Sequence, residues 1–206
     1  MKDPRLEMLT AQNSVLLLVD YQPTMFKGVA SGDRNAISNS AVAAAKAAKI
    51  LEVPTVLTSI WPEGNGEFIK EITDIFPGQE VIARKILGFD AFEDERVLQA
   101  VKKTGRNKVV VSGLWTSMCF AYTAIHGLRE GFDVYGLNDA GGDASPGAGG
   151  LGAMGGLLRR RAGLPSGRPG QQLPDGAGGV ARPGAGQTGA PPPHAGGADR
   201  PGRRGR

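Results

Sequence analysis

The sequence predicts an α/β fold: a three-layer α/β/α sandwich around a mostly parallel sheet, followed by a low-complexity tail. The first observation behind this prediction is that apolar runs of strand length alternate with helical patterns over the first 140 residues. The second is that the runs are not separated by hairpin turns, so successive strands are joined by crossovers that cover both faces of a parallel sheet. The alternation stops after residue 143, which divides the chain into a predicted domain, 1–143, and a tail, 144–206.

Five apolar segments are predicted to be strands. In the fourth of them, Val109, Val110 and Val111 are β-branched and uninterrupted by polar residues, which favours a strand buried on both faces over a half-exposed one. The five predicted ranges are 14–20, 54–60, 80–83, 107–112 and 132–137.

Three helical patterns lie between the strands. The first begins at Asp33 and stops before Pro54, and the second begins at Asp90, with Glu93 completing a capping box, and closes at Gly105. The third is predicted to be capped by Ser117 and to end at a left-handed glycine, Gly131. Its apolar stripe is expected to consist of Ala121, Tyr122, Ile125 and Leu128.

Three reactive side chains follow three different predicted strands. Asp20 ends the first, Lys85 follows the third, and Cys119 falls in the first turn of the helix after the fourth. Ligands of open α/β sheets bind at the carboxyl ends of the strands, so we expect these residues to share a site there. The helix dipole at Cys119 would favour a thiolate. The alternatives are a capping aspartate, a surface lysine and an inert core cysteine.

The composition limits the compartment and the partners. A single cysteine excludes an internal disulfide and fits a reducing compartment. The polar N-terminus lacks the apolar core of a signal peptide, and no apolar run approaches the ~20 residues of a membrane span, so we expect a cytoplasmic protein without a membrane partner. Residues 1–140 carry 15 Lys and Arg against 17 Asp and Glu, whereas the last 66 carry 9 against 3. The excess of basic over acidic residues therefore lies in the tail.

The tail has an unusual composition. From residue 141 onward it holds 21 of the 32 glycines and 9 of the 14 prolines, with no lysine, glutamate, isoleucine or aromatic residue. Such a segment cannot bury enough apolar surface to offset chain entropy, so we expect disorder. Our hypothesis for this composition is a reading-frame shift near Pro146 in GC-rich coding DNA, which would leave an unpaired sheet edge.

Three motifs carry a resemblance to a known family. VDYQPTMF around Asp20, KILGFDAF from Lys85 and SGLWTSMC before and including Cys119 resemble the motifs of the isochorismatase-like cysteine hydrolase superfamily, specifically its YcaC-like branch, over about residues 9–143. The resemblance implies an Asp20–Lys85–Cys119 triad that cleaves a small amide or related C–N bond through a thioester. It also implies an oxyanion hole from the backbone N–H groups of Cys119 and Trp115, and a cis peptide at Leu114–Trp115.

The sequence departs from the family in two places. Where nicotinamidases of the superfamily carry metal-binding histidines, this chain has none between residues 59 and 63, so we expect neither a metal nor a cofactor; His126 is predicted to lie on a helix surface or at an interface. The family's last helix and strand are also missing from the tail. Candidate substrate-binding residues are Gln22, Phe26, Trp61 and Thr116.

Two further functions stay open from the sequence. One is a nucleic-acid-binding protein that acts through the Gly/Arg tail, although its arginines form no regular repeats and no aromatic residues lie between them. The other is a hydrolase fold that has lost its activity with the altered C-terminus. For the leading hypothesis, the expected partners are a small amide-type substrate and further copies of the same chain.

Overall fold

All five strands of the computed structural model, which describes residues 7–85 and 87–146, form one parallel sheet. Their order is β3-β2-β1-β4-β5, with β1 in the centre. The register pairs Leu16 with Thr55 of β2 on one side and with Val110 of β4 on the other. The predicted fold class is therefore confirmed. The strands are β1 (Ser14–Val19), β2 (Thr55–Ile60), β3 (Val81–Arg84), β4 (Lys108–Gly113) and β5 (Asp133–Gly136).

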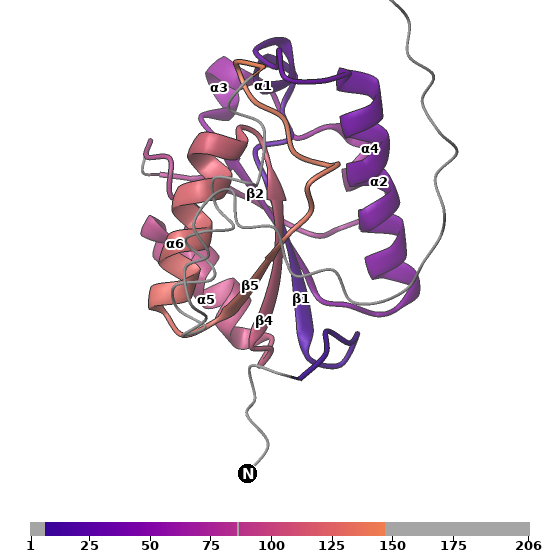
Figure 1. Ribbon diagram of the computed structural model, residues 1–206, viewed down its shortest axis with the longest axis vertical. Coiled ribbons are helices and arrows are strands. Elements are labelled where there is room, and N and C mark those ends of the chain that lie inside the picture. The colour runs from indigo at the N-terminus through magenta and orange to yellow at the C-terminus, as the bar shows by residue number, and fades with distance from the viewer. Residues whose placement is uncertain (1–6, 86, 147–206) are drawn as a thin grey trace, which may run out of the picture. The chain divides into compact units, whose positions relative to one another are not determined.

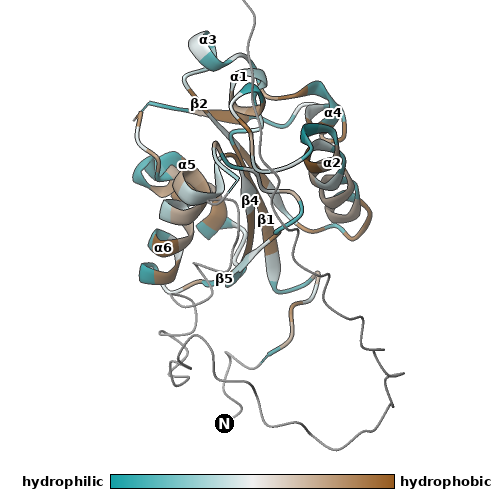
Figure 2. Ribbon diagram, turned by 45° about the horizontal axis from the view of Figure 1, so that its top comes forward, coloured by the Kyte–Doolittle hydropathy of each residue, from teal (hydrophilic) through white to brown (hydrophobic). Residues whose placement is uncertain are grey.

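Helices cover both faces of this sheet (Figures 1 and 2). One layer holds α2 (Arg34–Ile50) and α4 (Lys70–Thr73), and the other holds α5 (Glu95–Lys103) and α6 (Ala121–Arg129). Successive residues of β1 divide between the two cores: Val15 and Leu17 pack with α5 and α6, whereas Leu16 and Leu18 pack with α2. This period of two is the geometry of an extended chain, and it makes β1 buried along its whole length.

The first two predicted helices are present, but only the first begins where it was predicted. Asp33 caps α2, since its carboxylate accepts a hydrogen bond from the Ala36 N–H at 2.7 Å. The predicted cap of α5 is wrong: Asp94 caps that helix, while Asp90 caps the preceding 3₁₀ turn, η2 (Ala91–Glu93). Asp90 has a glutamate three residues later and Asp94 does not, so the capping-box pattern favours the wrong aspartate. Two short helices that were not predicted begin at prolines, α1 (Pro23–Lys27) and α3 (Pro62–Asn65).

The helix after β4 begins with an irregular turn. A π-helical turn, η3 (Thr116–Phe120), runs directly into α6, and its N-cap is Trp115 rather than the predicted Ser117. The buried side of α6 consists of Thr123, Ala124 and Gly127, and the predicted stripe member Tyr122 is 53% exposed. A π turn takes more residues per turn than an α-helix, so it shifts the buried side away from the one that a regular helix would present.

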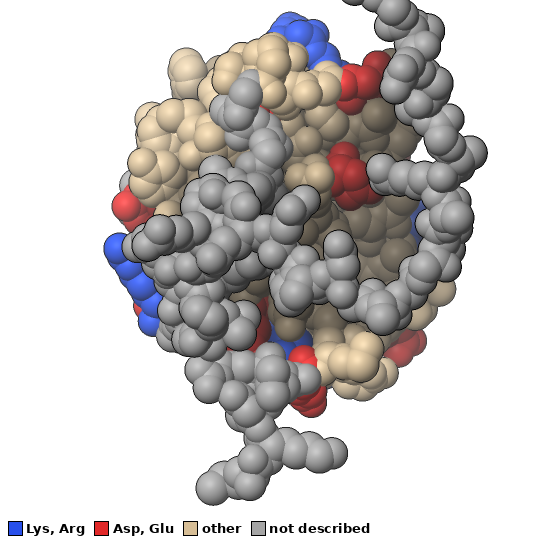
Figure 3. Space-filling model, in the orientation of Figure 1, with Lys and Arg blue, Asp and Glu red and all other residues tan. Residues whose placement is uncertain are grey.

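Glycines end two of the helices as predicted. Gly105 follows α5 with φ 67° and Gly131 follows α6 with φ 97°, both in the left-handed region that glycine reaches without strain. Almost all of the predicted tail lies outside the described residues. None of the described helices is long and apolar enough to cross a membrane. In Figure 3, the acidic and basic side chains of the described residues are scattered over the visible surface and form no broad basic area.

Candidate active site

Asp20 directly follows the central strand and has a constrained backbone. Its φ is 60°, a left-handed conformation that aspartate tolerates better than most residues. Its N–H donates to the Thr58 carbonyl of β2 at 2.9 Å, and its own carbonyl accepts from the Gln22 N–H at 2.8 Å. The residue is fully buried. A charged side chain is thus held inside the protein at the carboxyl edge of the sheet.

Arg84, the last residue of β3, is the cation that meets Asp20. Its Nη1 and Nη2 donate to the two carboxylate oxygens of Asp20, each at 2.8 Å, and both side chains are fully buried. Arg84 lies two residues after Ile82 and so on the same side of the strand, which faces α5 and α6. A bidentate arginine–carboxylate pair of this kind fixes orientation as well as charge.

Lys85, the lysine of the expected triad, is not brought to Asp20. Its side chain is exposed, and its main-chain N–H donates to the Asp94 carboxylate at 3.0 Å. Neighbouring residues of an extended chain point to opposite sides, so Arg84 and Lys85 cannot both face the site. The position expected for Lys85 is therefore held by Arg84, which the sequence analysis did not single out.

Cys119 completes the group at the carboxyl edge. It is 2% exposed within η3, and its thiol lies near enough to the Asp20 carboxylate to be affected by its charge. Burial raises the pKa of Cys119 to about 12, and the Asp20 carboxylate adds to the rise, while Arg84 and the Trp115 N–H oppose it. Burial also raises the pKa of Asp20, against the effect of Arg84. The expected resting thiolate is therefore not what the structure favours, because burial and the neighbouring Asp20 carboxylate both favour the protonated thiol.

Trp115 supplies the backbone beside the sulfur. The Leu114–Trp115 peptide is cis, as the resemblance implied. The Trp115 N–H opposes the rise in the pKa of Cys119, which places this backbone donor near the sulfur. The indole Nε1 donates to the Met25 carbonyl at 3.0 Å, and the ring covers Gly28, where a Cβ would collide with it. Trp115 is thereby anchored to α1 and its loop.

The four candidate substrate-binding residues divide into two kinds. Gln22 is buried and holds the loop after β2, because its amide nitrogen donates to the Gly66 carbonyl at 2.6 Å and its amide oxygen accepts from the Ile60 N–H at 3.0 Å. Thr116 is buried, and its hydroxyl donates a hydrogen bond to the Gly142 carbonyl at 3.3 Å. These two residues brace the backbone around the site.

The other two candidates are more accessible. Phe26 is half-buried, with its ring 6.0 Å from that of Tyr21. Trp61 is 53% exposed and has φ 45°, a conformation unusual for a bulky residue. It follows β2, at the same edge of the sheet as Asp20. Strain of this kind at a strand end is frequent in ligand-binding segments.

The sequence analysis missed the connection between the cysteine turn and residues 142–143. The Thr116 N–H donates to the Gly142 carbonyl at 2.9 Å, and the Ser117 N–H donates to Oδ2 of Asp143 at 2.6 Å. The Asp143 carbonyl also accepts from the Ala30 N–H at 2.8 Å, which links the same turn to the segment after α1. The aspartate follows glycines and an alanine in a stretch without periodicity, so no pattern marked it.

The described residues offer no metal site: among 7–85 and 87–146, no three His, Cys, Asp or Glu side chains gather around one point. His126 is half-buried, and its Nδ1 lies 2.7 Å from the Asp90 carboxylate.

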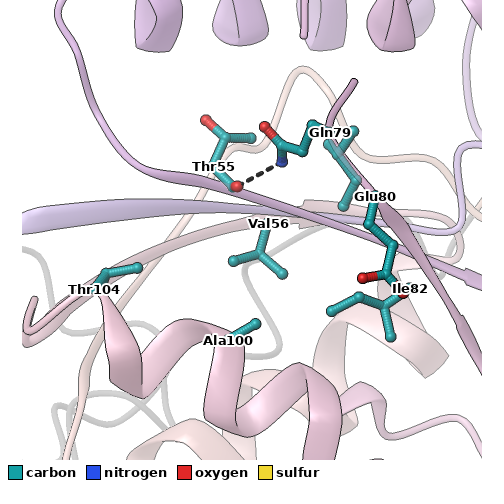
Figure 4. A pocket seen from close by; sticks show the side chains of 8 residues that line it. Thr55, Val56, Gln79, Glu80, Ile82, Ala100 and Thr104 are labelled. Atoms are coloured by element: carbon teal, nitrogen blue, oxygen red, sulfur yellow. Dashed lines mark hydrogen bonds between the residues drawn. The ribbon is translucent and has the colours of Figure 1, made fainter. Parts of the chain in front are cut away.

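A cavity of about 260 Å³ lies at the amino end of the strands, the opposite end from Asp20, near the first residues of β2 and β3 and the end of α5. Figure 4 shows Val56, Ile82 and Ala100 around it, with Gln79 donating to the Thr55 carbonyl. It contains none of the site residues.

Comparison with known families identifies the chain. Residues 14–150 match the Isochorismatase domain, which is more than half of the sequence. The chain belongs to the isochorismatase family. A curated relative, "Probable hydrolase YcaC" from Escherichia coli strain K12, is 33% identical over 135 residues, which are 65% of this chain and 64% of the relative. This chain thus spans somewhat less than two thirds of that relative's length.

Two solved structures of the same branch confirm the fold. The E. coli YcaC gene product, described as an octameric hydrolase of unknown specificity, superposes with a TM-score of 0.68 at 29% identity and covers 76% of this chain and 75% of its own. YcaC from Pseudomonas aeruginosa, solved with hexane-2,5-diol and covalent acrylamide, gives a TM-score of 0.69 at 29% identity, with 77% of each chain covered. The resemblance to the YcaC-like branch is therefore confirmed.

Proposed function

We propose that the protein is a metal-independent cysteine hydrolase that cleaves a small amide or related C–N bond, with Cys119 as nucleophile, Asp20 as general base and Arg84 as the orienting cation. The observation that carries this proposal is the fully buried, bidentate Asp20–Arg84 pair, whose charges act on the buried Cys119 thiol. A buried ion pair is a poor source of stability, so its place beside the one cysteine favours a chemical role. The names of the related proteins support a hydrolase.

The first half of the reaction follows from the two raised pKa values. Asp20, whose pKa is raised, accepts the thiol proton as the sulfur attacks the carbonyl carbon, since a free thiolate is too costly in this buried position. The tetrahedral oxyanion accepts hydrogen bonds from the backbone N–H groups of Trp115 and Cys119. Asp20 then returns the proton to the departing amine, which leaves a thioester on Cys119.

The second half reverses the proton transfers. Water enters where the amine left, gives a proton to Asp20 and attacks the thioester carbon. The second tetrahedral intermediate collapses, the C–S bond breaks, and the sulfur takes the proton back from Asp20. Arg84 remains charged throughout and holds the carboxylate in place, so only one proton moves back and forth at the site.

The proposal extends to the kind of substrate and to the oligomeric state. Phe26 and Trp61 supply aromatic surface near the carboxyl edge, which suits the apolar part of a small amide. The octameric state of the E. coli relative supports a homo-oligomer of this chain.

Acrylamide, an amide that alkylates thiols, gives a direct test of the proposed base. We expect native protein at pH 7 to form a single adduct, on Cys119, and Asp20→Asn to slow its formation by about 100-fold, at the lower end of general-base effects. Intact mass measured over time gives the rate, and Cys119→Ala, which should stay folded and form no adduct, identifies the site. An adduct rate unaffected by Asp20→Asn would overturn the role of Asp20, and amide hydrolysis surviving in Cys119→Ala would exclude the cysteine.

A further inference from the structure

The side chains of Asp94 and Arg96, which we call the bracket, hold the backbone on both sides of Arg84. We propose that the bracket is a positioning unit for this catalytic arginine, an inference that rests on the proposed function of Arg84. Among the described residues, no hydrogen bond or ion pair joins either residue to Asp20 or Cys119, so the bracket acts through the orientation that it gives to Arg84.

The contacts of the bracket lie immediately before and after the arginine. The main-chain N–H of Lys85 donates to Oδ2 of Asp94 at 3.0 Å. On the other side, Nη2 of Arg96 donates to the carbonyl of Ala83 at 2.6 Å. The two peptide groups that flank Arg84 are therefore both fixed to the same pair of side chains.

The bracket is itself rigid. The Asp94 carboxylate accepts hydrogen bonds from the Lys85 N–H and from three groups of Arg96: its main-chain N–H at 3.1 Å, Nε at 3.0 Å and Nη2 at 2.7 Å. Asp94 is 5% exposed and is also the N-cap of α5. Its hydrogen bonds, above all those from Arg96, lower the pKa of Asp94 well below its ordinary value. The carboxylate therefore stays charged, and it ties β3 to a packed helix.

Arg84 needs such support because its strand provides little. Within the described sheet, β3 is an edge strand of four residues that pairs only with β2. The guanidinium is held by Asp20 and, at 3.5 Å, by the Thr58 hydroxyl, while its buried Nε has no hydrogen-bond partner in the part of the chain that the structure describes. A tilt of the strand end would swing this long side chain away from the carboxylate and the thiol.

The chain offers a matched control on the same helix. Lys102 and Glu130 form an ion pair at 2.7 Å between α5 and the end of α6, with both side chains partly exposed, but this pair does not contact β3. If the Asp94–Arg96 pair were merely structural, its loss should affect Cys119 no more than loss of the Lys102–Glu130 pair. A positioning role predicts an effect of Arg96 on Cys119 that Lys102 does not share.

The test compares Arg96→Met and Lys102→Met in the full chain, by their acrylamide adduct rates at pH 7 and their Tm values. We expect Arg96→Met to slow the adduct about tenfold, since small misplacements of catalytic groups cost this much or more, and Lys102→Met to stay within twofold of the parent. Asp94→Asn, which retains an N-cap residue but loses the charged partner of Arg96, should also slow the adduct. Equal rates for Arg96→Met and Lys102→Met would overturn the inference.

A double-variant cycle separates this outcome from failure of the proposed function. Arg84→Lys keeps the positive charge, so it avoids an uncompensated Asp20, but removes the bidentate fork, and we expect it to slow the adduct. Adding Arg96→Met to Arg84→Lys should then slow it little further, because the group being positioned is already gone. If Arg96→Met slows the adduct as much in Arg84→Lys as in the parent, the positioning role of the bracket is overturned and the role of Arg84 is not. An adduct rate unchanged by Arg84→Lys would instead overturn the proposed role of Arg84.

Discussion

The two ends of the sheet each bury a charged side chain, and they do so in different ways. At the carboxyl end, Asp20 and Arg84 are both fully buried, the backbone of Asp20 is left-handed, and Nε of Arg84 has no partner among the described residues. At the amino end, Lys108 is fully buried but pairs with Asp133, which is 29% exposed, at 3.1 Å, and its ammonium lies 5.8 Å from the centre of the Tyr135 ring.

The two pairs differ in how much hydration they lose on folding. The amino-end pair keeps one partner in contact with water, so little hydration is lost. The carboxyl-end pair gives up the hydration of both charges, which hydrophobic side chains of similar size would avoid. The carboxyl end is thus less stable than hydrophobic side chains of similar size would make it, and it is also the end that holds the cysteine.

The largest expected difference between the two ends is in the free energy of unfolding. Arg84→Met leaves a buried carboxylate without its partner and should cost about 3–5 kcal/mol, whereas Lys108→Met leaves Asp133 accessible to water and should cost about 1 kcal/mol. Denaturant unfolding at pH 7 measures both. The double variant Asp20→Asn, Arg84→Met should recover most of the loss without recovering reactivity. Similar costs at the two ends would contradict the comparison.

A smaller effect is expected from the titration of Cys119. Its pKa is about 12 in the folded protein against about 8.5 in an unfolded chain, so the folded state binds the proton more tightly. The resulting stability is present below pH 8.5 and is lost as the pH rises toward 12. Between pH 7 and pH 10 the parent should lose ~2 kcal/mol more than Cys119→Ala. Tyr21, whose pKa burial also raises, is present in both proteins and cancels in this difference. Parallel curves for the two proteins would show that the thiol is not held neutral.

The smallest effect is expected at Lys85. Its exposed side chain should have little influence on the buried pair, so Lys85→Met should change the acrylamide adduct rate by less than about threefold, while Arg84→Lys lowers it further. Both rates are measured at low and at moderate salt, because a long-range effect of an exposed charge would fade with salt. A loss at Lys85 as large as that at Arg84 would restore the lysine to the site.

The fold and the placement of Asp20 and Cys119 at the carboxyl edge could be predicted because their signals are local. A buried parallel strand is a continuous apolar run; Asp20 directly follows one such run, and Cys119 lies in the turn that follows another. The choice between Arg84 and Lys85 could not be made in this way. Two adjacent cations look alike in sequence, and only the pairing of β3 with β2 decides which one faces inward.

The remaining errors share a physical cause. Ser117 is a good capping residue, yet the π turn places Trp115 at the N-cap and leaves the Ser117 N–H to Asp143, 26 residues later in the chain. The thiolate was expected from the helix terminus alone, but burial outweighs that contribution. In each case a contact or an environment that is remote in sequence overrides the local preference.

The hydrogen bonds of Asp143 also bear on where a shortened chain could end. This residue links the turn of Cys119 to the segment at Ala30 and Ser31. A fragment ending at Pro146 keeps these hydrogen bonds, whereas one ending at Ala140 retains the five described strands but loses them. For protein engineering, the boundary of a fragment that preserves the cysteine turn is therefore set by Asp143 rather than by the end of β5.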